Sequence, residues 1–421
     1  MKKKHTILLI MTIAMFLGYL PWYNFSAVLN YIAADFNLDA AQIGYILASI
    51  QVGYVIIVIF TGWLSDKIGE IKIVAWATLL TGIFSTLFAW LAIDFYSILV
   101  LRLLTGLSAG AIYVPGISYL SRWFTSNERG RVIGIYTGAL TAAYAGGYFV
   151  ASPLASKYGW QAGIIWTSLP AFIAALLLFL IVNQKAPEPD DNILLTDNGT
   201  DSIVKPAPEG GYAGPALITT SYMGHMWELY AFWGWIGPFL VASTLAVGYE
   251  ENIAVALGGK LAAFVIMFGV PAVSLWGLVA DKLGRTKTII VAALCSLVAE
   301  LFLGFLYGHS LIIIVLLSFW IGFWVIADSA IYKAGLTEMV SYKIRSTALG
   351  FQSAIGYIMT IISPIVFGLV LEYQNGKTNP IYAENWGGAF LLLGVGALVA
   401  PLAALVLRRL PQARLMAKGK M

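Results

Sequence analysis

The sequence predicts an all-α integral membrane protein with twelve transmembrane helices in two pseudo-symmetric six-helix bundles. Of its 421 residues, 60% are hydrophobic and only 11% are charged, and the mean hydropathy of +0.83 lies outside the range of soluble domains. Apolar runs recur along nearly the whole chain, each long enough to cross about 30 Å of hydrocarbon as a helix. A charged motif between two of these runs also returns once, so the chain is predicted to be duplicated.

Each apolar run is bounded by short charged segments, which place the helices. The first run follows a basic MKKKH and has the form of a secretory signal, but the internal repeat needs it as a helix. The expected helices are 6–28, 40–64, 72–93, 95–119, 131–154, 161–183, 215–243, 255–280, 287–307, 310–333, 346–371 and 386–408.

The repeat consists of two copies of a loop motif. GWLSDKIGEIK at 62–72 returns as GLVADKLGRTK at 277–287, and ERGRVIG at 128–134 is echoed by KIRSTALG at 343–350. Six helices duplicated in the same orientation form a parallel repeat. We therefore expect an N-terminal bundle at 1–183 and a C-terminal bundle at 215–421. Residues 184–214, rich in Pro, Gly and acidic residues, form the linker.

The distribution of positive charge predicts the orientation. With both termini in the cytoplasm, Lys157 and Lys377 are the only Lys or Arg in outer loops, and Arg102 and Lys260 lie within spans. This asymmetry follows the positive-inside rule for a multi-pass protein of the plasma membrane. The net charge of +4 thus reflects topology, and no nucleic-acid partner is indicated.

The loop motifs resemble those of the major facilitator superfamily, and the resemblance covers essentially the whole chain. RLLTGLSAG, which starts at Arg102, is similar to the fourth-helix motif of that superfamily, and Glu70 departs from the family's usual basic residue. The resemblance implies a central cavity lined by helices 1, 4, 7 and 10. It also favours a gate latch formed by Gly62, Asp66, Lys67, Gly69, Gly277, Asp281, Lys282, Gly284, Arg285, Arg129 and Arg345. The alternative is that these charges only fix topology.

Charged side chains within the spans are the main candidates for substrate binding or coupling. An ionised group at mid-membrane costs about 3 kcal/mol or more, so it normally faces a cavity or a partner. Arg102, His225, Glu228 and Asp328 all fall on helices that the resemblance assigns to the cavity, and none is duplicated in the repeat. Glu228 is expected to carry a proton with His225 or Arg102 as partner, although a structural role for Arg102 is the alternative.

Aromatic and amide side chains are the second group of candidates. We expect them to give the cavity apolar walls with a few polar groups. Pro21 and Pro238 occupy matching places in helices 1 and 7 and are expected to loosen both. The candidate lining residues are Tyr19, Tyr23, Asn24, Tyr230 and Trp324.

Three further intramembrane charges receive simpler interpretations. Glu300 lies in a peripheral helix, where a protonated or locally hydrogen-bonded carboxyl suffices. Lys260 is expected to reach the outer interface, and Lys333 to anchor the cytoplasmic end of its helix.

These features predict a secondary transporter that works by alternating access. Arg102 and His225 favour a proton-coupled symporter of a small organic or inorganic anion; the alternative is a proton-coupled exporter of cationic or lipophilic compounds. No HExxH or GxxxxGK[ST] motif is present, so neither an enzyme nor a cofactor is expected. The expected partners are the substrate, protons and the lipid bilayer, with the protein a monomer.

The helix-7 stretch HMWELYAFWGW loosely resembles the corresponding helix of cyanate and nitrate/nitrite permeases.

Overall fold

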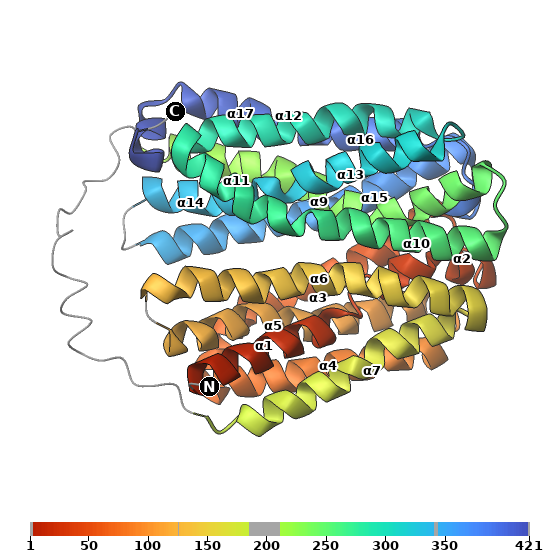
Figure 1. Ribbon diagram of the computed structural model, residues 1–421, viewed down its shortest axis with the longest axis horizontal. Helices are drawn as coiled ribbons and strands as arrows, with labels where there is room; N and C mark the ends of the chain where they lie inside the picture. The colour runs from red at the N-terminus through yellow and green to blue at the C-terminus, as the bar shows by residue number, and fades with distance from the viewer. Residues whose placement is uncertain (1–2, 125, 185–210, 341–343, 420–421) are drawn as a thin grey trace.

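A computed structural model describes residues 3–124, 126–184, 211–340 and 344–419 (Figure 1). The side chains of residues 62, 66, 126–130, 345–347 and 418 are not part of this description. Within the described ranges the chain is helical and contains no strand. The predicted linker 184–214 falls mainly outside them, so its boundaries stay a prediction.

The first half of the chain forms the predicted six-helix bundle. Its helices are α1 (Lys3–Tyr19), α2 (Asn24–Asp35), α3 (Ala40–Ile68), α4 (Glu70–Leu91), α5 (Phe95–Trp123), α6 (Ser126–Tyr158) and α7 (Trp160–Ile181). The helices α1 and α2 are two parts of one membrane span.

The second half repeats this arrangement. Its α-helices are α9 (Ala213–Ala246), α10 (Glu251–Phe268), α11 (Val270–Leu283), α12 (Arg285–Leu303), α13 (Leu311–Ala327), α14 (Ser329–Met339), α15 (Arg345–Asn375), α16 (Gly387–Ala397) and α17 (Val399–Arg408). Short 3₁₀ segments are η1 (Gly304–Leu306), η3 (Pro380–Tyr382) and η4 (Pro411–Gly419). Eleven helical segments of the described chain are long and apolar enough to span a membrane. The α6 helix is not among them but occupies the twelfth place of the fold.

Two prolines that were expected to loosen helices behave differently. Residues 20–23, including Pro21, interrupt the first span, because proline has no N–H and its ring clashes with the preceding turn. Pro238 lies inside the continuous helix α9, so helix 7 is not interrupted there, and its expected loosening stays a prediction. In the second half, the spans divide instead at Gly269, Asp328 and Leu398.

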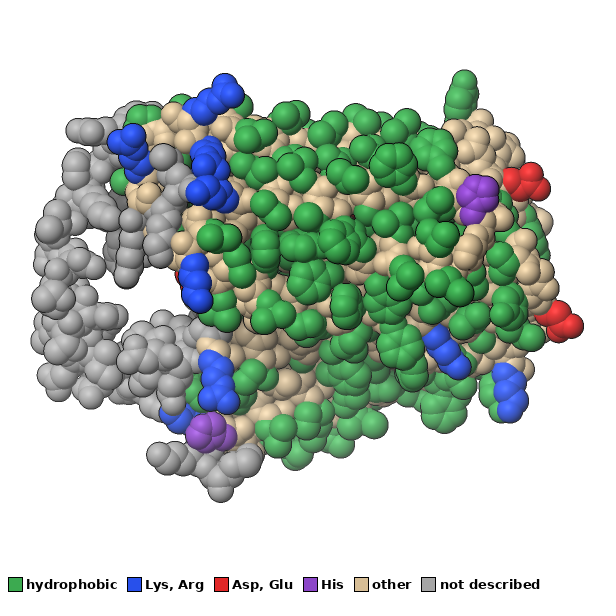
Figure 2. Space-filling view, turned by 45° about the horizontal axis from the view of Figure 1, so that its top comes forward, with side chains coloured by type: hydrophobic (Ala, Val, Ile, Leu, Met, Phe, Trp, Pro, Cys, Tyr) green, Lys and Arg blue, Asp and Glu red, His purple; other side chains and the backbone are tan. Residues whose placement is uncertain are grey.

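Both termini lie at the same end of the bundle, which we call the termini side, and the opposite end is the far side (Figure 1). In the space-filling view most of the visible Lys and Arg side chains gather toward the termini side, and hydrophobic side chains cover the belt between the two ends (Figure 2). This is the charge pattern that the sequence predicts.

The two halves meet mainly along α3 with α15 and α6 with α10. On the far side the Tyr31 hydroxyl donates to Asn252 Oδ1 over 2.8 Å, and Asn379 Nδ2 donates to the Asn30 carbonyl over 2.9 Å. Nearer the middle, Tyr54 and Tyr357 share a hydrogen bond of 3.1 Å. Among the described residues, the hydrogen bonds between halves lie from the middle of the membrane to the far side. The structure is therefore closed at the far side.

The repeat is visible in the loop backbones. Gly69 joins α3 to α4 with φ 94°, and Gly284 joins α11 to α12 with φ 98°. Each position is followed by a charged residue that pairs with the end of a neighbouring helix, but the polarity is swapped. Glu70 accepts from Arg122 at 3.2 Å, whereas Arg285 donates to Glu338 at 2.8 Å. The unusual acid at position 70 thus has its own partner.

The remaining latch candidates divide into two groups. Lys67 stacks over Trp63, with Nζ 4.1 Å from the ring centre, and Asp281 pairs with Arg285 at 2.6 Å. Lys282 is exposed, and Gly277 has open space around it. The side chains of Gly62, Asp66, Arg129 and Arg345 lie outside the described residues. The gate latch stays a prediction.

We expect Gly284→Ala to lower the free energy of unfolding by about 1–3 kcal/mol, because only glycine adopts this backbone conformation without strain. Thermal unfolding of the purified protein in detergent measures this. Gly277→Ala is the matched control, because a methyl group there meets nothing within 4 Å. Equal melting temperatures for the two variants would contradict the backbone argument.

We expect Glu70→Arg alone to destabilise the protein by about 1 kcal/mol or less, because it faces Arg122 in a pair that is partly exposed. The double variant Glu70→Arg with Arg122→Glu reproduces the polarity of the second half and should recover wild-type stability. A double-mutant cycle of melting temperatures tests this. Additive losses in the double variant would show that the two side chains do not interact.

Candidate functional site

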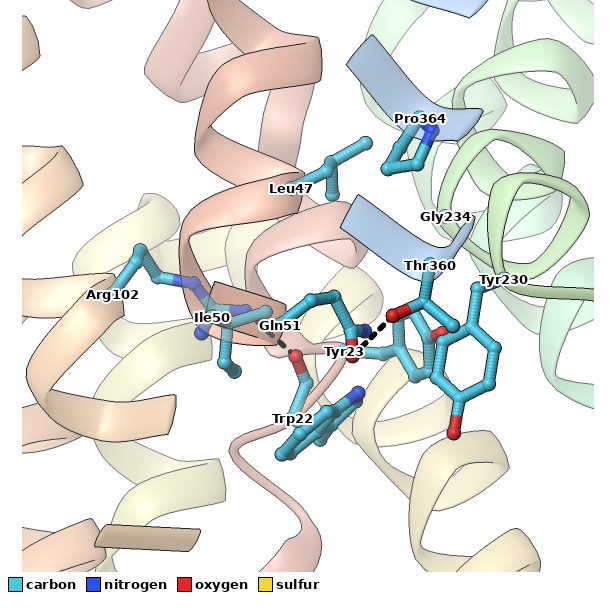
Figure 3. Close-up of a pocket in the computed structure, with 10 residues that line it drawn as sticks. All are labelled: Trp22, Tyr23, Leu47, Ile50, Gln51, Arg102, Tyr230, Gly234, Thr360 and Pro364. Carbon is cyan, nitrogen blue, oxygen red and sulfur yellow. Dashed lines mark hydrogen bonds between the residues drawn. The ribbon is translucent and has the colours of Figure 1, made fainter. Parts of the chain in front are cut away.

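A small central pocket lies between the halves, at the level where the first span is interrupted (Figure 3). Gln51 of α3 and Thr360 of α15 meet across it, the Thr360 hydroxyl donating to Gln51 Oε1 at 3.4 Å. Three of the predicted residues, Arg102, Tyr23 and Tyr230, line this pocket. The complete lining is Trp22, Tyr23, Leu47, Ile50, Gln51, Arg102, Tyr230, Gly234, Thr360 and Pro364.

Arg102 supports the interrupted first span. Its guanidinium donates to the carbonyls of Pro21 at 3.2 Å and Trp22 at 2.8 Å, and to Asn24 Oδ1 at 3.5 Å. A helix end leaves carbonyl groups without partners and carries partial negative charge, which a cation stabilises. Arg102 thus has the structural role that was weighed for it and also lines the pocket, while its role in binding an anion stays a prediction.

Arg102 also brings an uncompensated positive charge to the pocket. It is 3% exposed, and no carboxylate of the described residues forms an ion pair with it. Its Nε is buried without a hydrogen-bond partner in the described structure. An anion in the pocket would complete these interactions.

Aromatic rings from both halves line and surround the pocket. Tyr23 packs edge-on against Trp233 with ring centroids 6.3 Å apart, and Tyr144 packs against the same indole at 5.4 Å. Tyr230 lies 5.9 Å from Trp233 and 6.3 Å from Tyr357. Tyr230 and Trp233 of helix 7 thus pack between the two halves, whereas Trp235 packs against Phe367 and Trp386 within the C-terminal half.

Two of the other three predicted charges, His225 and Glu228, lie on the opposite face of helix 7, and the third, Asp328, lies at the junction of α13 and α14. Glu228 precedes Tyr230 by two residues, which is about 200° around an α-helix. Ser221, on the same face as Glu228, donates to the Ala400 carbonyl of α17 at 2.7 Å. His225, Glu228 and Asp328 are therefore directed into the C-terminal bundle and do not line the central pocket. The three residues lie in the parts of the chain that were expected to line the cavity, but their side chains are not on the faces that line the pocket.

His225 and Asp328 form a buried pair with its own hydrogen bonds. His225 Nδ1 lies 2.9 Å from Asp328 Oδ1, and its Nε2 lies 2.6 Å from the Ser329 hydroxyl. Tyr332 donates to Asp328 Oδ2 at 2.7 Å. The division between α13 and α14 at Asp328 brings these groups together.

Glu228 has an acidic neighbour, Glu300 of α12. Both residues are at most 2% exposed, and their carboxyl groups lie close enough to interact electrostatically. Glu228 Oε1 and both oxygens of Glu300 have no hydrogen-bond partner of good geometry in the described structure. Two carboxylates cannot both be ionised at such close range in a low-dielectric interior. The pair is suited to holding a proton.

The remaining predicted residues take structural positions. The Tyr19 hydroxyl donates to the Ala109 carbonyl at 2.7 Å, and Asn24 Nδ2 donates to Thr167 Oγ1 at 3.0 Å inside the N-terminal bundle. Trp324 packs against Trp276 with ring centroids 4.8 Å apart, away from the pocket. None of the three is among the residues that line the central pocket.

Sequence reasoning missed Gln51 and Thr360. Both are polar side chains inside apolar runs, and polar residues in spans tend to face a cavity. No group of three His, Cys, Asp or Glu side chains within the described residues is arranged to hold a metal ion.

Residues 11–255 match the Major Facilitator Superfamily. The chain belongs to this superfamily. It is a membrane transporter and not an enzyme, with the twelve-helix fold that the sequence predicts.

Individual relatives of this facilitator are distant but nearly full-length. It is 25% identical to the cis,cis-muconate transport protein of Acinetobacter baylyi over 87% of each chain. It is 23% identical to the hexuronate transporter of Bacillus subtilis, covering 96% of this chain and 94% of that one. Its fold matches the crystal structure of a bacterial homologue of the human lysosomal transporter Spinster, in an inward-facing and occupied conformation, with a TM-score of 0.77, 17% identity and 96% of both chains covered. The finer resemblance to cyanate and nitrate/nitrite permeases stays a prediction.

We expect Arg102→Lys in this facilitator to lower the free energy of unfolding by about 1–3 kcal/mol, because a single ammonium group lacks the planar fork whose two nitrogens donate to the two carbonyls. Thermal unfolding in detergent measures the loss. Arg122→Lys, in a partly exposed ion pair, serves as the control and should cost less than about 1 kcal/mol. A melting temperature of Arg102→Lys equal to that of the control would show that the helix interruption does not depend on the guanidinium.

Proposed function

We propose that the protein is a proton-coupled symporter of small anions that works by alternating access. The observation that carries this proposal is Arg102, a buried cation that lines the central pocket without a carboxylate partner among the described residues. Burying a charge in a membrane protein is costly unless a partner compensates it, and an anionic substrate provides that partner. The chain is similar to a muconate transporter and a hexuronate transporter, and the substrates in both names are carboxylates.

The position of the acidic residues favours the anion over a cationic drug. Glu228 lies on the face of α9 that is directed away from the pocket. Asp328 lies at the α13–α14 junction and is also directed away from the pocket. A cation in the pocket would meet aromatic rings and Arg102 instead of these carboxylates. Export of cationic or lipophilic compounds is therefore the weaker alternative.

Glu228 and Glu300 are the proposed site of the coupled proton. The groups around them are His225 on α9, Asp328 and Tyr332 from the α13–α14 region, and Ser296 on α12. No titratable side chain of α16 or α17 faces them in the described residues. Since one helix carries Tyr230 on one face and Glu228 on the other, loading of the pocket and proton release are coupled through movement of α9.

We further propose that both termini are cytoplasmic and that the protein acts as a monomer in the plasma membrane. The gathering of Lys and Arg on the termini side supports this orientation. In this orientation, the closed far side is the outer side of the membrane.

Transport by the purified protein in proteoliposomes tests the proposal. Small carboxylates, inorganic anions, sugars and cationic drugs are added singly, and a pH-sensitive dye reports proton movement. An anion that carries protons with it in the same direction is the expected result. Proton movement only with cations, and in the opposite direction, would identify an exporter.

We expect Glu228→Gln and Glu300→Gln each to abolish proton-driven accumulation of the substrate while leaving exchange of substrate across the membrane intact, because exchange needs no net proton transfer. Accumulation and counterflow are measured in the same proteoliposomes. Glu250→Gln, an exposed carboxyl at the start of α10, is the matched control. Unchanged accumulation in both variants would place the coupled proton elsewhere.

A further inference from the structure

Lys333 is a second intramembrane cation, and its side chain does not anchor the end of a helix as its sequence position suggests. It lies in the middle of α14, five residues after Asp328. Its Nζ donates to Ser353 Oγ of α15 at 2.6 Å and lies 4.4 Å from the ring centre of Tyr222 of α9. The ammonium group is thus held between α9, α14 and α15 inside the bundle.

The contact with Ser353 shows which way Lys333 faces. Ser353, Tyr357, Thr360 and Pro364 are spaced i, i+4, i+7 and i+11 along α15, so they share one face of the helix. Tyr357 and Thr360 bond to α3 of the other half, and Thr360 and Pro364 line the central pocket. The face that Lys333 touches is therefore the one that α15 turns toward the N-terminal half.

Lys333 lies on the termini side of the pocket. Ser353 precedes Thr360 by seven residues, which corresponds to about 10 Å along a helix axis. Lys333 therefore lies on the termini side of the pocket that Arg102 lines, beside the face of α15 that meets the N-terminal half.

The charges around Lys333 leave it without an anionic partner. Asp328, the nearest acid along its own chain segment, is directed to His225 and Tyr332. Within the part of the chain that the structure describes, no ion pair includes Lys333. Tyr222 and Ser353 stabilise the ammonium by a cation–π contact and a hydrogen bond, but they do not neutralise it.

From this arrangement we propose that Lys333 binds a second carboxylate and that the preferred substrates are organic dianions. One carboxylate of the substrate lies at Arg102 in the N-terminal half, and the other displaces Ser353 at the Lys333 ammonium in the C-terminal half. Such a ligand joins the two halves by one ion pair on each side. This inference rests on the proposed anion transport and adds the class of substrate.

Uptake of labelled adipate and hexanoate by the full chain in proteoliposomes tests the inference, because these acids have equal carbon number and differ by one carboxylate. Wild-type protein should show a lower KM for adipate. Lys333→Gln should raise the KM for adipate about tenfold or more, the loss expected for a hydrogen bond to a charged group, and leave that for hexanoate unchanged. Lys333→Arg keeps the charge and should keep the preference. Lys260→Gln, an exposed lysine of α10, is the matched control.

The possible results separate this inference from the function on which it rests. Transport of hexanoate with no preference for adipate, or an unchanged ratio of the two KM values in Lys333→Gln, would overturn the dianion proposal and leave anion transport standing. Transport of cations but of no anion would overturn both. If Lys333→Gln does not fold, Ser353→Ala replaces it, since this variant keeps the lysine and removes only its competing partner. It should lower the KM for adipate alone, and an unchanged KM would count against the proposal.

Discussion

The structure depends on the interaction between Arg102 and the interrupted first span. Pro21 breaks the helix in the middle of the membrane, where lipid offers no hydrogen bonds to the freed carbonyl groups. The guanidinium of α5 supplies those hydrogen bonds and holds α1 and α2 in place. At the equivalent position of the second half the chain has Leu317, and its first helix, α9, continues through Pro238 without interruption. The two halves thus differ at the position where Arg102 stabilises an interrupted helix.

The same arginine joins structure to transport. A group that only closed the helix break could lie wholly within the N-terminal bundle, but Arg102 also lines the pocket between the halves. Its fixed hydrogen bonds orient the guanidinium, so little conformational freedom is lost when an anion arrives. Lys333, the proposed second carboxylate-binding residue in the C-terminal half, is held in a similar way by Ser353 and Tyr222. An anion between them would contact both halves at once.

Helix α9 separates two chemical environments. Tyr230 and Gly234 face the pocket, whereas His225 and Glu228 face the interior of the C-terminal bundle. Substrate and proton are therefore proposed to bind on opposite sides of one helix, without direct contact. Coupling in such an arrangement requires that the helix itself move or rotate between states, which is consistent with its continuous 34-residue length.

The sequence by itself determined the membrane class, the helix positions and the duplication, because hydropathy and motif spacing are local properties. It also predicted Arg102, Tyr23 and Tyr230 as binding or coupling residues, and these three line the pocket. Only the tertiary structure decided which face of each helix meets which neighbour. The orientation of each helix about its own axis directs Glu228 toward Glu300 and Lys333 toward Ser353. It also places Gln51 next to Thr360. The physical reason is that a helix surrounded by other helices and lipid is apolar on nearly every side, so its sequence carries little amphipathic signal to fix its orientation.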